Sequence, residues 1–168
     1  MDEKAVRESQ VELSQGMCIA DANLAGFVHG GVIMKLVDSA GGLAAIRHAR
    51  GMVVTAAIDE MVFIEPIQLG SLVTVKASVN LVGHTSMEVG VRVETENILT
   101  GERVHASSAY LVFVAIDDDT GKPRPVPGLI AESPDEKRRM REARIRREAR
   151  LARRASILEQ RAAGDGDW

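Results

Sequence analysis

Hydrophobic residues between positions 31 and 48 fall on almost every side of a helical wheel. The stretch is too long for an ordinary strand. A helix that is apolar nearly all round is typical of a central, buried position. The pattern therefore predicts one long buried helix. The Gly41-Gly42 pair within it costs roughly 1 kcal/mol per residue in helix propensity relative to alanine, which indicates a close approach to a neighbouring element.

A period of two marks the segments that follow this helix. Apolar and polar residues alternate in them, as they do in antiparallel strands with one buried face. Residues 82–85 join two of the strands as a hairpin. The expected strands lie within residues 6–16, 53–64, 72–81, 86–95 and 103–116.

The order of these elements indicates the fold class. Helix and strands do not alternate, so we expect an α+β fold with an antiparallel sheet. A single long helix buries its apolar circumference only if the sheet curls around it. The chain has 168 residues and 45% apolar content but only 3% aromatic residues, so the core must consist of Val, Ile, Leu, Met and Ala. We assign residues 1–130 to one domain and residues 131–168 to a charged tail.

The tail differs from the body in charge. Residues 134–163 carry 11 Lys/Arg and 5 Asp/Glu, whereas residues 1–133 carry 10 and 17. Ser133, Pro134 and Glu136 predict a helix that begins with a capping box, and Glu142 and Arg146 are spaced for an ion pair on it. Its apolar stripe is thin, so we expect a solvated basic helix. Contact with acidic partners or phosphates is the alternative, and the acidic body without a reader motif argues against nucleic acid.

Other features of the composition indicate a cytoplasmic protein. The single cysteine, Cys18, excludes an intrachain disulfide and provides no zinc cluster. The N-terminus is too acidic for a signal peptide. No apolar run approaches the roughly 18–20 residues of a membrane span.

One carboxylate, Asp38, lies within the predicted buried helix. An apolar setting tolerates such a group only when it is paired or functional, and from residue type alone a structural carboxylate is as reasonable as a catalytic one. Asn23 and His29-Gly30-Gly31 form a polar loop just before the helix. Asn23 is also an ordinary loop residue. We interpret His29 as an orienting hydrogen-bonding residue rather than a base.

These groups suit attack on a carbonyl carbon. Backbone N–H groups at a helix N-terminus, here near Gly30 and Gly31, polarise a carbonyl and stabilise an oxyanion. Asp38 lies two turns along, where it can activate a water or attack directly, and the sequence does not separate these routes. Thr85 and Ser86, in the hairpin, are further candidates, with an ordinary polar hairpin as the alternative.

The chain resembles a known family over residues 6–129. Its segments NLAGFVHGG, MKLVD, AIRH and GHTSM, with the closing GKP and VP, are similar to those of the hotdog-fold acyl-CoA thioesterases. The similarity is to the branch that contains the YciA-like bacterial enzymes and the mammalian brain acyl-CoA hydrolase. The resemblance implies a long central helix wrapped by a curled antiparallel sheet, with the basic helix as an extra C-terminal element. It also implies hydrolysis of acyl-CoA at a subunit interface.

The resemblance assigns roles to individual residues. Asn23 and Asp38 fall on the family's catalytic positions, so a homodimer, or a trimer of dimers, would build each site from two subunits. The family's usual arginine in the hairpin is His84 here. No metal or cofactor is expected, since CoA arrives with the substrate. The catalytic candidates are Asp38, Asn23, Gly31 and Thr85, and the substrate-binding candidates are His29, Gly30, Ser86, Arg47 and Arg103.

Three alternative functions are left open. A hotdog hydratase would need an Asp/His pair, which Asn23 and Asp38 fit poorly. An acyl-CoA sensor would bind without hydrolysis and use the basic tail as its effector. A pure interaction module would depend on residues 134–168 alone.

Overall fold

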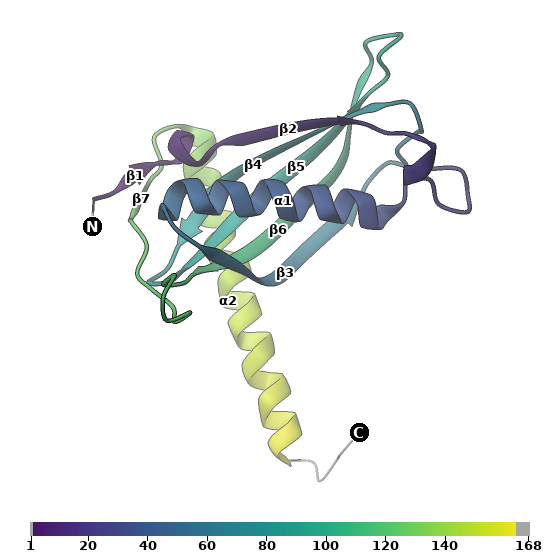
Figure 1. Ribbon diagram of the computed structural model, residues 1–168. Helices are drawn as coiled ribbons and strands as arrows, with labels where there is room; N and C mark the ends of the chain where they lie inside the picture. Colours follow the sequence, from purple (N-terminus) through teal and green to yellow (C-terminus); the bar gives the residue numbers. More distant parts are fainter. Residues whose placement is uncertain (1, 164–168) are drawn as a thin grey trace.

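A five-stranded antiparallel sheet curls around one long helix in the computed structural model, which describes residues 2–163 (Figure 1). Helix α1 (Gly30–Ala49) lies along the concave face, and the strand order is β2-β4-β5-β6-β3. This confirms the α+β fold with an antiparallel sheet. The strands are β2 (Val11–Gly16), β3 (Val53–Phe63), β4 (Leu72–Val82), β5 (Ser86–Glu96) and β6 (Arg103–Ala115). Strands β1 (Lys4–Ala5) and β7 (Leu129–Ile130) pair separately in parallel.

The N-terminal segment confirms only the second half of the strand expected over residues 6–16. It begins with the 3-10 turn η1 (Val6–Ser9), and only β2 joins the sheet; a second such turn, η2 (Ile19–Asp21), follows it. The buried Ser9 hydroxyl donates to the Val6 carbonyl (2.7 Å) and accepts from the Val79 N–H (3.0 Å). The Ser9 side chain therefore makes hydrogen bonds to the backbone that pairing with a neighbouring strand would otherwise provide.

The core lies between α1 and the concave face of the sheet. Fully buried valines of β4 and β5 meet the side of α1 that carries Ile33, Val37 and Ala40. A Cβ atom on Gly41 would lie 3.1 Å from two ring carbons of Phe113. The close contact with a neighbouring element that the Gly41-Gly42 pair predicted is therefore made by Gly41, against Phe113 of β6.

The prediction that α1 is buried all round is wrong for a single chain. One sheet covers only one side of a helix, and Met34, Leu43 and Ile46 on the other side remain 40–43% exposed. Asp38 lies on that uncovered side and is exposed as well. The edge strand β3 continues the open apolar surface with Ile58 and Phe63, which are 42% and 51% exposed. We call this combined surface of α1 and β3 the open face.

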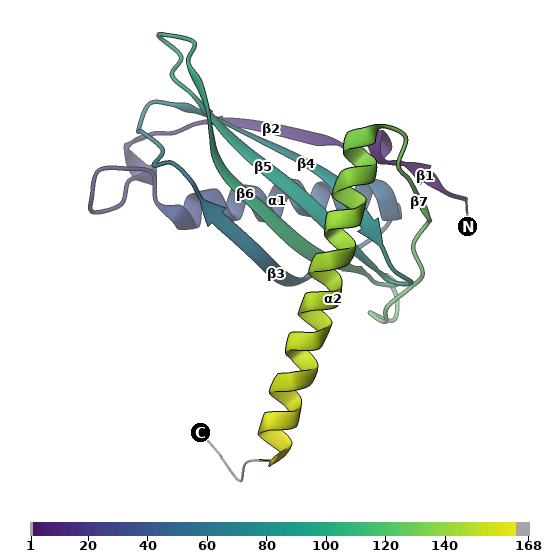
Figure 2. The same cartoon turned by 180° about the vertical axis from the view of Figure 1, so that it is seen from behind.

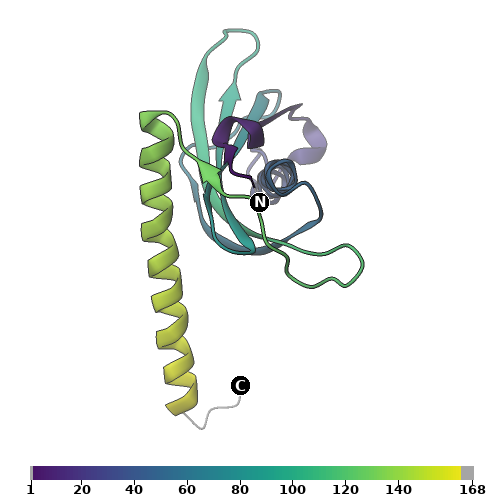
Figure 3. The same ribbon diagram turned by 90° about the vertical axis from the view of Figure 1, so that its left-hand side faces the viewer.

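Helix α2 (Pro134–Ala163) lies on the convex side of the sheet, away from α1 (Figures 2 and 3). The capping box is confirmed, because the Glu136 N–H donates to Ser133 Oγ (3.2 Å) and the Ser133 N–H donates to Glu136 Oε2 (2.9 Å). The C-terminal turns of the helix extend beyond the sheet. No helix within residues 2–163 is long and apolar enough to span a membrane. The last five residues of the predicted tail, 164–168, lie outside the described part of the chain.

The first half of α2 is docked, which corrects the expectation of a solvated helix. Arg146 donates to Glu88 on β5 (2.7 Å), and its guanidinium stacks 3.5 Å from the ring centre of Tyr110. Burial raises the pKa of Glu88, and Arg146 opposes that shift. The predicted pair of Glu142 with Arg146 is wrong, since Glu142 accepts from Arg138 (2.8 Å). The sheet therefore offers Arg146 a better partner than its own helix does.

A second ion-pair cluster holds α2 farther along. Arg150 (2.7 Å) and Arg153 (3.2 Å) both donate to Asp59 on β3. The β3–β6 register shifts between Ile58 and Glu60, so Asp59 is a bulged residue, and its carboxylate is only 7% exposed. A bulge re-aims a side chain, and here it directs a carboxylate toward α2.

Candidate active site

The loop before α1 is held together by Asn23. Its Oδ1 atom accepts from the N–H groups of Ala25 (2.9 Å) and Phe27 (3.2 Å). The backbone of Asn23 also exchanges hydrogen bonds with the loop, and Gly26 takes a left-handed conformation (φ 83°) that closes it. Only the oxygen of the amide is used within residues 2–163, so the NH₂ group is the end that a substrate can meet.

His29 caps the N-terminus of α1. Its Nδ1 atom accepts from the Gly31 N–H (2.8 Å), and its carbonyl accepts from the Val32 N–H (2.9 Å). This geometry agrees with an orienting role for His29. The Gly31 N–H is thus engaged by the cap. The Gly30 N–H has no hydrogen-bond acceptor among residues 2–163, so it is available to a substrate.

Phe63 borders that free amide. A Cβ atom on Gly30 would lie 3.4 Å from the Phe63 ring, and the ring itself is 51% exposed. Glycine therefore leaves room at the helix N-terminus, and the aromatic ring forms an apolar wall beside it. A carbonyl oxygen can approach an N–H donor there, with apolar substrate atoms against the ring.

Asp38 is paired with a threonine of the neighbouring strand. The Thr55 hydroxyl on β3 donates to Asp38 Oδ1 (2.8 Å), which fixes the carboxylate on the open face. The sequence analysis missed Thr55. The available signal was that Thr55 is the single polar side chain in residues 53–58, a hydroxyl inside an otherwise apolar strand segment.

Asn23 and Asp38 make no contact with each other in one chain. Asn23 is tied into the loop before α1, whereas Asp38 lies on the helix against β3. Their separation is what a site shared between two copies would require. The expected pairing of Asn23 with Asp38 stays a prediction.

Thr85 and Ser86 are not brought to Asp38. The Thr85 carbonyl accepts from the Ala115 N–H (2.9 Å) at the end of the sheet. The neighbouring Met87 is buried in the core beneath α1, so Ser86 points to the convex face. In a single chain, Ser86 and Asp38 therefore lie on opposite sides of the sheet.

Arg47 and Arg103 lie at opposite ends of the molecule. Arg47, near the C-terminus of α1, donates to the Gln10 carbonyl. Arg103 begins β6 and pairs with Glu96 (2.9 Å), at the end where α1 starts. Since a helix of this length spans about 30 Å, the two arginines of one chain cannot hold the same phosphate group.

The residues of the site provide no obvious metal centre. No group of three or more His, Cys, Asp or Glu suited to a metal ion occurs within residues 2–163. The chemistry available is that of a carboxylate, a hydroxyl, an amide and a free backbone N–H. These groups suit attack on a polarised carbonyl.

Comparison with known proteins identifies the family. A model of the Thioesterase superfamily matches residues 25–102. The cytosolic acyl coenzyme A thioester hydrolase of Mus musculus is 37% identical over 84% of this chain, which spans only 37% of the length of that protein. An uncharacterized acyl-CoA thioester hydrolase of Bacillus subtilis is 38% identical over 77% of this chain and 75% of its own length. The chain therefore belongs to the thioesterase superfamily, as its resemblance implied.

Solved structures agree on the fold, including α2. An apo-hexameric acyl-CoA thioesterase superposes with a TM-score of 0.89 at 35% identity, covering 92% of this chain and 99% of that one. The acyl-CoA hydrolase of Staphylococcus aureus, in complex with butyryl coenzyme A, coenzyme A and coenzyme A disulfide, gives 0.88 at 33% identity, with 96% and 98% covered. Structures of that enzyme include variants with alanine in place of one aspartate, one asparagine or one threonine. The hotdog fold is confirmed.

Proposed function

We propose that this chain hydrolyses acyl-CoA thioesters to a carboxylic acid and CoA. The observation that carries the proposal is a carboxylate, Asp38, that Thr55 fixes on the open face. The names of the relatives support it. So does the spacing of the residues replaced in the S. aureus enzyme, which equals the spacing of Asn23, Asp38 and Thr55 here.

The residues can share the reaction as follows. The Gly30 N–H stabilises the negative charge that develops on the thioester oxygen. Because Gly30 lies about 12 Å along α1 from Asp38 of the same chain, it acts together with the Asp38 of a second copy. Asp38 takes the proton of an attacking water, the C–S bond breaks, and the proton passes to the leaving thiolate. In the direct route, Asp38 attacks the carbonyl, the C–S bond breaks and CoA leaves as a thiolate; water then cleaves the mixed anhydride and its proton passes to the thiolate. After a single turnover in ¹⁸O-labelled water, label in Asp38 establishes direct attack followed by addition of water at the aspartyl carbon. Neither route needs a metal or an added cofactor.

We propose further that the site is completed by a second copy of the chain. The open face exposes apolar side chains on α1 and on the long edge strand β3, a surface that is typical of an interface. Its burial in a homodimer would bring Asn23 of one subunit toward Asp38 of the other. The hexameric state of a similar thioesterase supports a trimer of dimers, and the word cytosolic in the names of the mammalian relatives supports a cytoplasmic location.

A thiol-release assay with acyl-CoAs of several chain lengths tests the activity. Asp38→Ala and Asn23→Ala should each lose most turnover while remaining folded. Asn97→Ala is a matched control, because Asn97 forms the same kind of side-chain turn in a distant loop (3.0 Å to the Leu99 N–H). Full activity in Asp38→Ala would refute the mechanism. Binding of acyl-CoA without any thiol release would favour the sensor instead.

Mixing the two inactive variants tests the shared site. In a two-fold dimer of one Asn23→Ala and one Asp38→Ala subunit, one of the two sites keeps both residues. Random mixing should therefore restore about a quarter of the parental activity. If both residues of a site come from the same chain, mixing restores nothing, and the shared site is wrong.

A further inference from the structure

Helix α2 crosses the convex face of the sheet and continues past its edge (Figures 2 and 3). Arg150 and Arg153 bind Asp59 on β3, which is the last strand on that side of the sheet. The ten residues that follow, 154–163, complete the helix, and we call them the projecting segment. At about 1.5 Å of rise per residue this segment is about 15 Å long, whereas neighbouring strands lie only about 4.8 Å apart. It is therefore long enough to cover strands that lie beyond β3.

The side of α2 that binds the sheet keeps its character in the projecting segment. Arg146 and Arg150 contact the sheet from that side. Ile157 and Arg161 follow Arg150 by seven and eleven residues, which are close to whole numbers of helical turns, so they face the same way, with Arg154 beside them. Ile157 is 45% exposed, and no ion pair within residues 2–163 involves Arg154 or Arg161. An apolar side chain and two arginines thus face the space beyond β3.

A groove of about 450 Å³ lies between the projecting segment and the edge of the sheet. Ala57 and Ile58 of β3 form one wall, and Arg154, Ile157 and Leu158 of α2 form the other. Strand β3 has 11 residues and pairs only with β6 in the described part of the chain. A long unpaired edge is a template for another strand. The groove therefore lies where a further strand would join the sheet, beneath the projecting segment.

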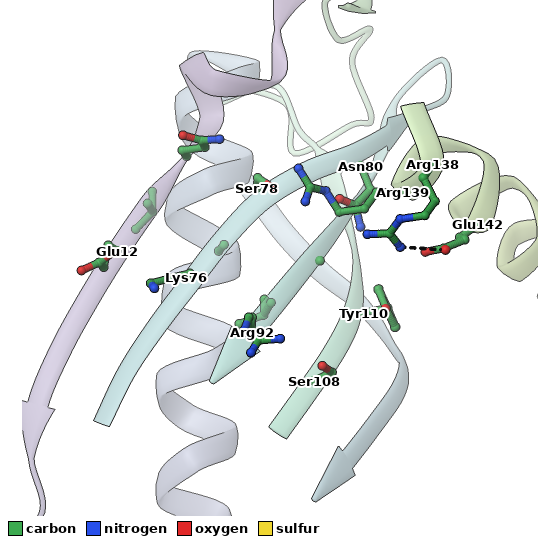
Figure 4. Close-up of a pocket in the computed structure, with 15 residues that line it drawn as sticks. Glu12, Lys76, Ser78, Asn80, Arg92, Ser108, Tyr110, Arg138, Arg139 and Glu142 are labelled. Carbon is green, nitrogen blue, oxygen red and sulfur yellow. Dashed lines mark hydrogen bonds and ion pairs between the residues drawn. The ribbon is translucent and has the colours of Figure 1, made fainter. Parts of the chain in front are cut away.

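The convex face of β3 carries side chains that match the projecting segment. Glu60 is paired in register with Tyr110 of β6, and Tyr110 lies on the face that meets α2 (Figure 4). Directly opposed residues point to the same side of a sheet, as do residues two apart on one strand. Glu60 and Val62 are therefore on the convex face. Glu60 is exposed and has no ion pair within residues 2–163, and Val62 is 46% exposed. This pairing of a carboxylate with an apolar side chain complements Ile157 and its flanking arginines.

We propose that the projecting segment of one subunit packs on the convex face of β3 of a second copy, so that each α2 bridges the dimer. The open face and the edge of β3 are the surfaces through which two copies would associate, and the partner's sheet then continues beneath the projecting segment. Ile157 contacts apolar side chains such as Val62 of the partner subunit, and Arg154 and Arg161 attract Glu60 of the partner subunit. Two-fold symmetry makes the contact twice. This inference rests on the proposed dimer but not on the proposed hydrolysis.

Sedimentation equilibrium of the full chain tests the bridge through charge reversal. Glu60→Arg, and separately Arg154→Glu with Arg161→Glu, should each weaken the dimer about tenfold or more, because like charges then meet across the subunit boundary. A mixture of the two variants should form heterodimers with the parental affinity, since both contacts again pair opposite charges. Charges paired within one chain would give no such rescue. Arg141→Glu with Arg144→Glu is the matched control, because both arginines are exposed on the docked half of α2, and it should associate as the parent does.

Photo-crosslinking locates the contact. A chain with Ile157→benzoylphenylalanine, mixed with ¹⁵N-labelled parent, should crosslink between copies to residues 53–64. Crosslinks confined to one chain, or to another part of the partner, overturn the proposal, as does a mixture of folded charge variants that associates no better than either variant alone. Thermal unfolding establishes that each variant is folded. A monomeric parent refutes the proposed dimer and the bridge together, whereas a parental dimer that neither reversal weakens refutes the bridge alone. Because association is measured without substrate, its failure is distinguishable from a failure of acyl-CoA hydrolysis.

Discussion

The hydrogen bond between Thr55 and Asp38 should be worth one to two orders of magnitude in catalysis. Thr55→Val removes the hydroxyl that donates to Asp38 Oδ1 at 2.8 Å and keeps the shape of the side chain. Hydrogen bonds to charged groups contribute about 1.5–3 kcal/mol. If the bond holds Asp38 in its reactive position, the variant should lose roughly 10- to 150-fold in kcat/KM.

The assay is steady-state thiol release from an acyl-CoA, with urea unfolding measured in parallel. Thr55→Ser retains the hydroxyl and should keep most of the activity. Thr74→Val is a matched control, because the Thr74 hydroxyl bonds Ser14 (2.9 Å) on the far side of the sheet, and its activity should equal that of the parent. A folded Thr55→Val with activity within about twofold of the parent would refute the reasoning.

Further predictions concern α2 and the response to acid. Arg146→Ala leaves Glu88 buried without its partner and should lower the free energy of unfolding by about 3–5 kcal/mol; a urea midpoint equal to that of the parent would contradict this. Ser133→Ala removes the cap of α2 and should cost about 1 kcal/mol, with faster amide exchange confined to its first turn; unchanged exchange there would count against the capping role. Hydrogen bonds from Lys76 and then Arg92 lower the pKa of Glu94 from 4.5 to about 2. Its stabilisation is therefore complete above pH 4.5 and is lost as the pH falls toward 2. Glu94→Gln should show a smaller loss of unfolding free energy over that window, and parallel acid curves would contradict the assignment.

Much of the fold was predictable because its signals are local. The alternation in β4 and β5 located both strands within a residue or two of their bounds, and the apolar run located α1. The capping box at Ser133 and Glu136 was readable because both partners lie three residues apart. Local spacing also indicated the polar loop at Asn23 and the helix start at His29.

The candidate site was predictable only in part. Asp38 and Asn23 stood out by residue type and by resemblance, but the partner of Asp38 did not. Thr55 lies 17 residues away, and only the packing of β3 beside α1 brings its hydroxyl to the carboxylate. Ser86 was a reasonable candidate by sequence, yet strand alternation turns it to the convex face.

The sequence by itself determined which segments become helix and strand, because periodicity and caps act within a few residues. The tertiary structure decided which sides of those elements are covered. One sheet buries one side of α1 and leaves Asp38 on the open face, although the sequence pattern is apolar nearly all round. Helix α2 is docked rather than solvated because Glu88 and Asp59, distant in sequence, meet its arginines. Such pairings depend on long-range register and bulges, which no local pattern specifies.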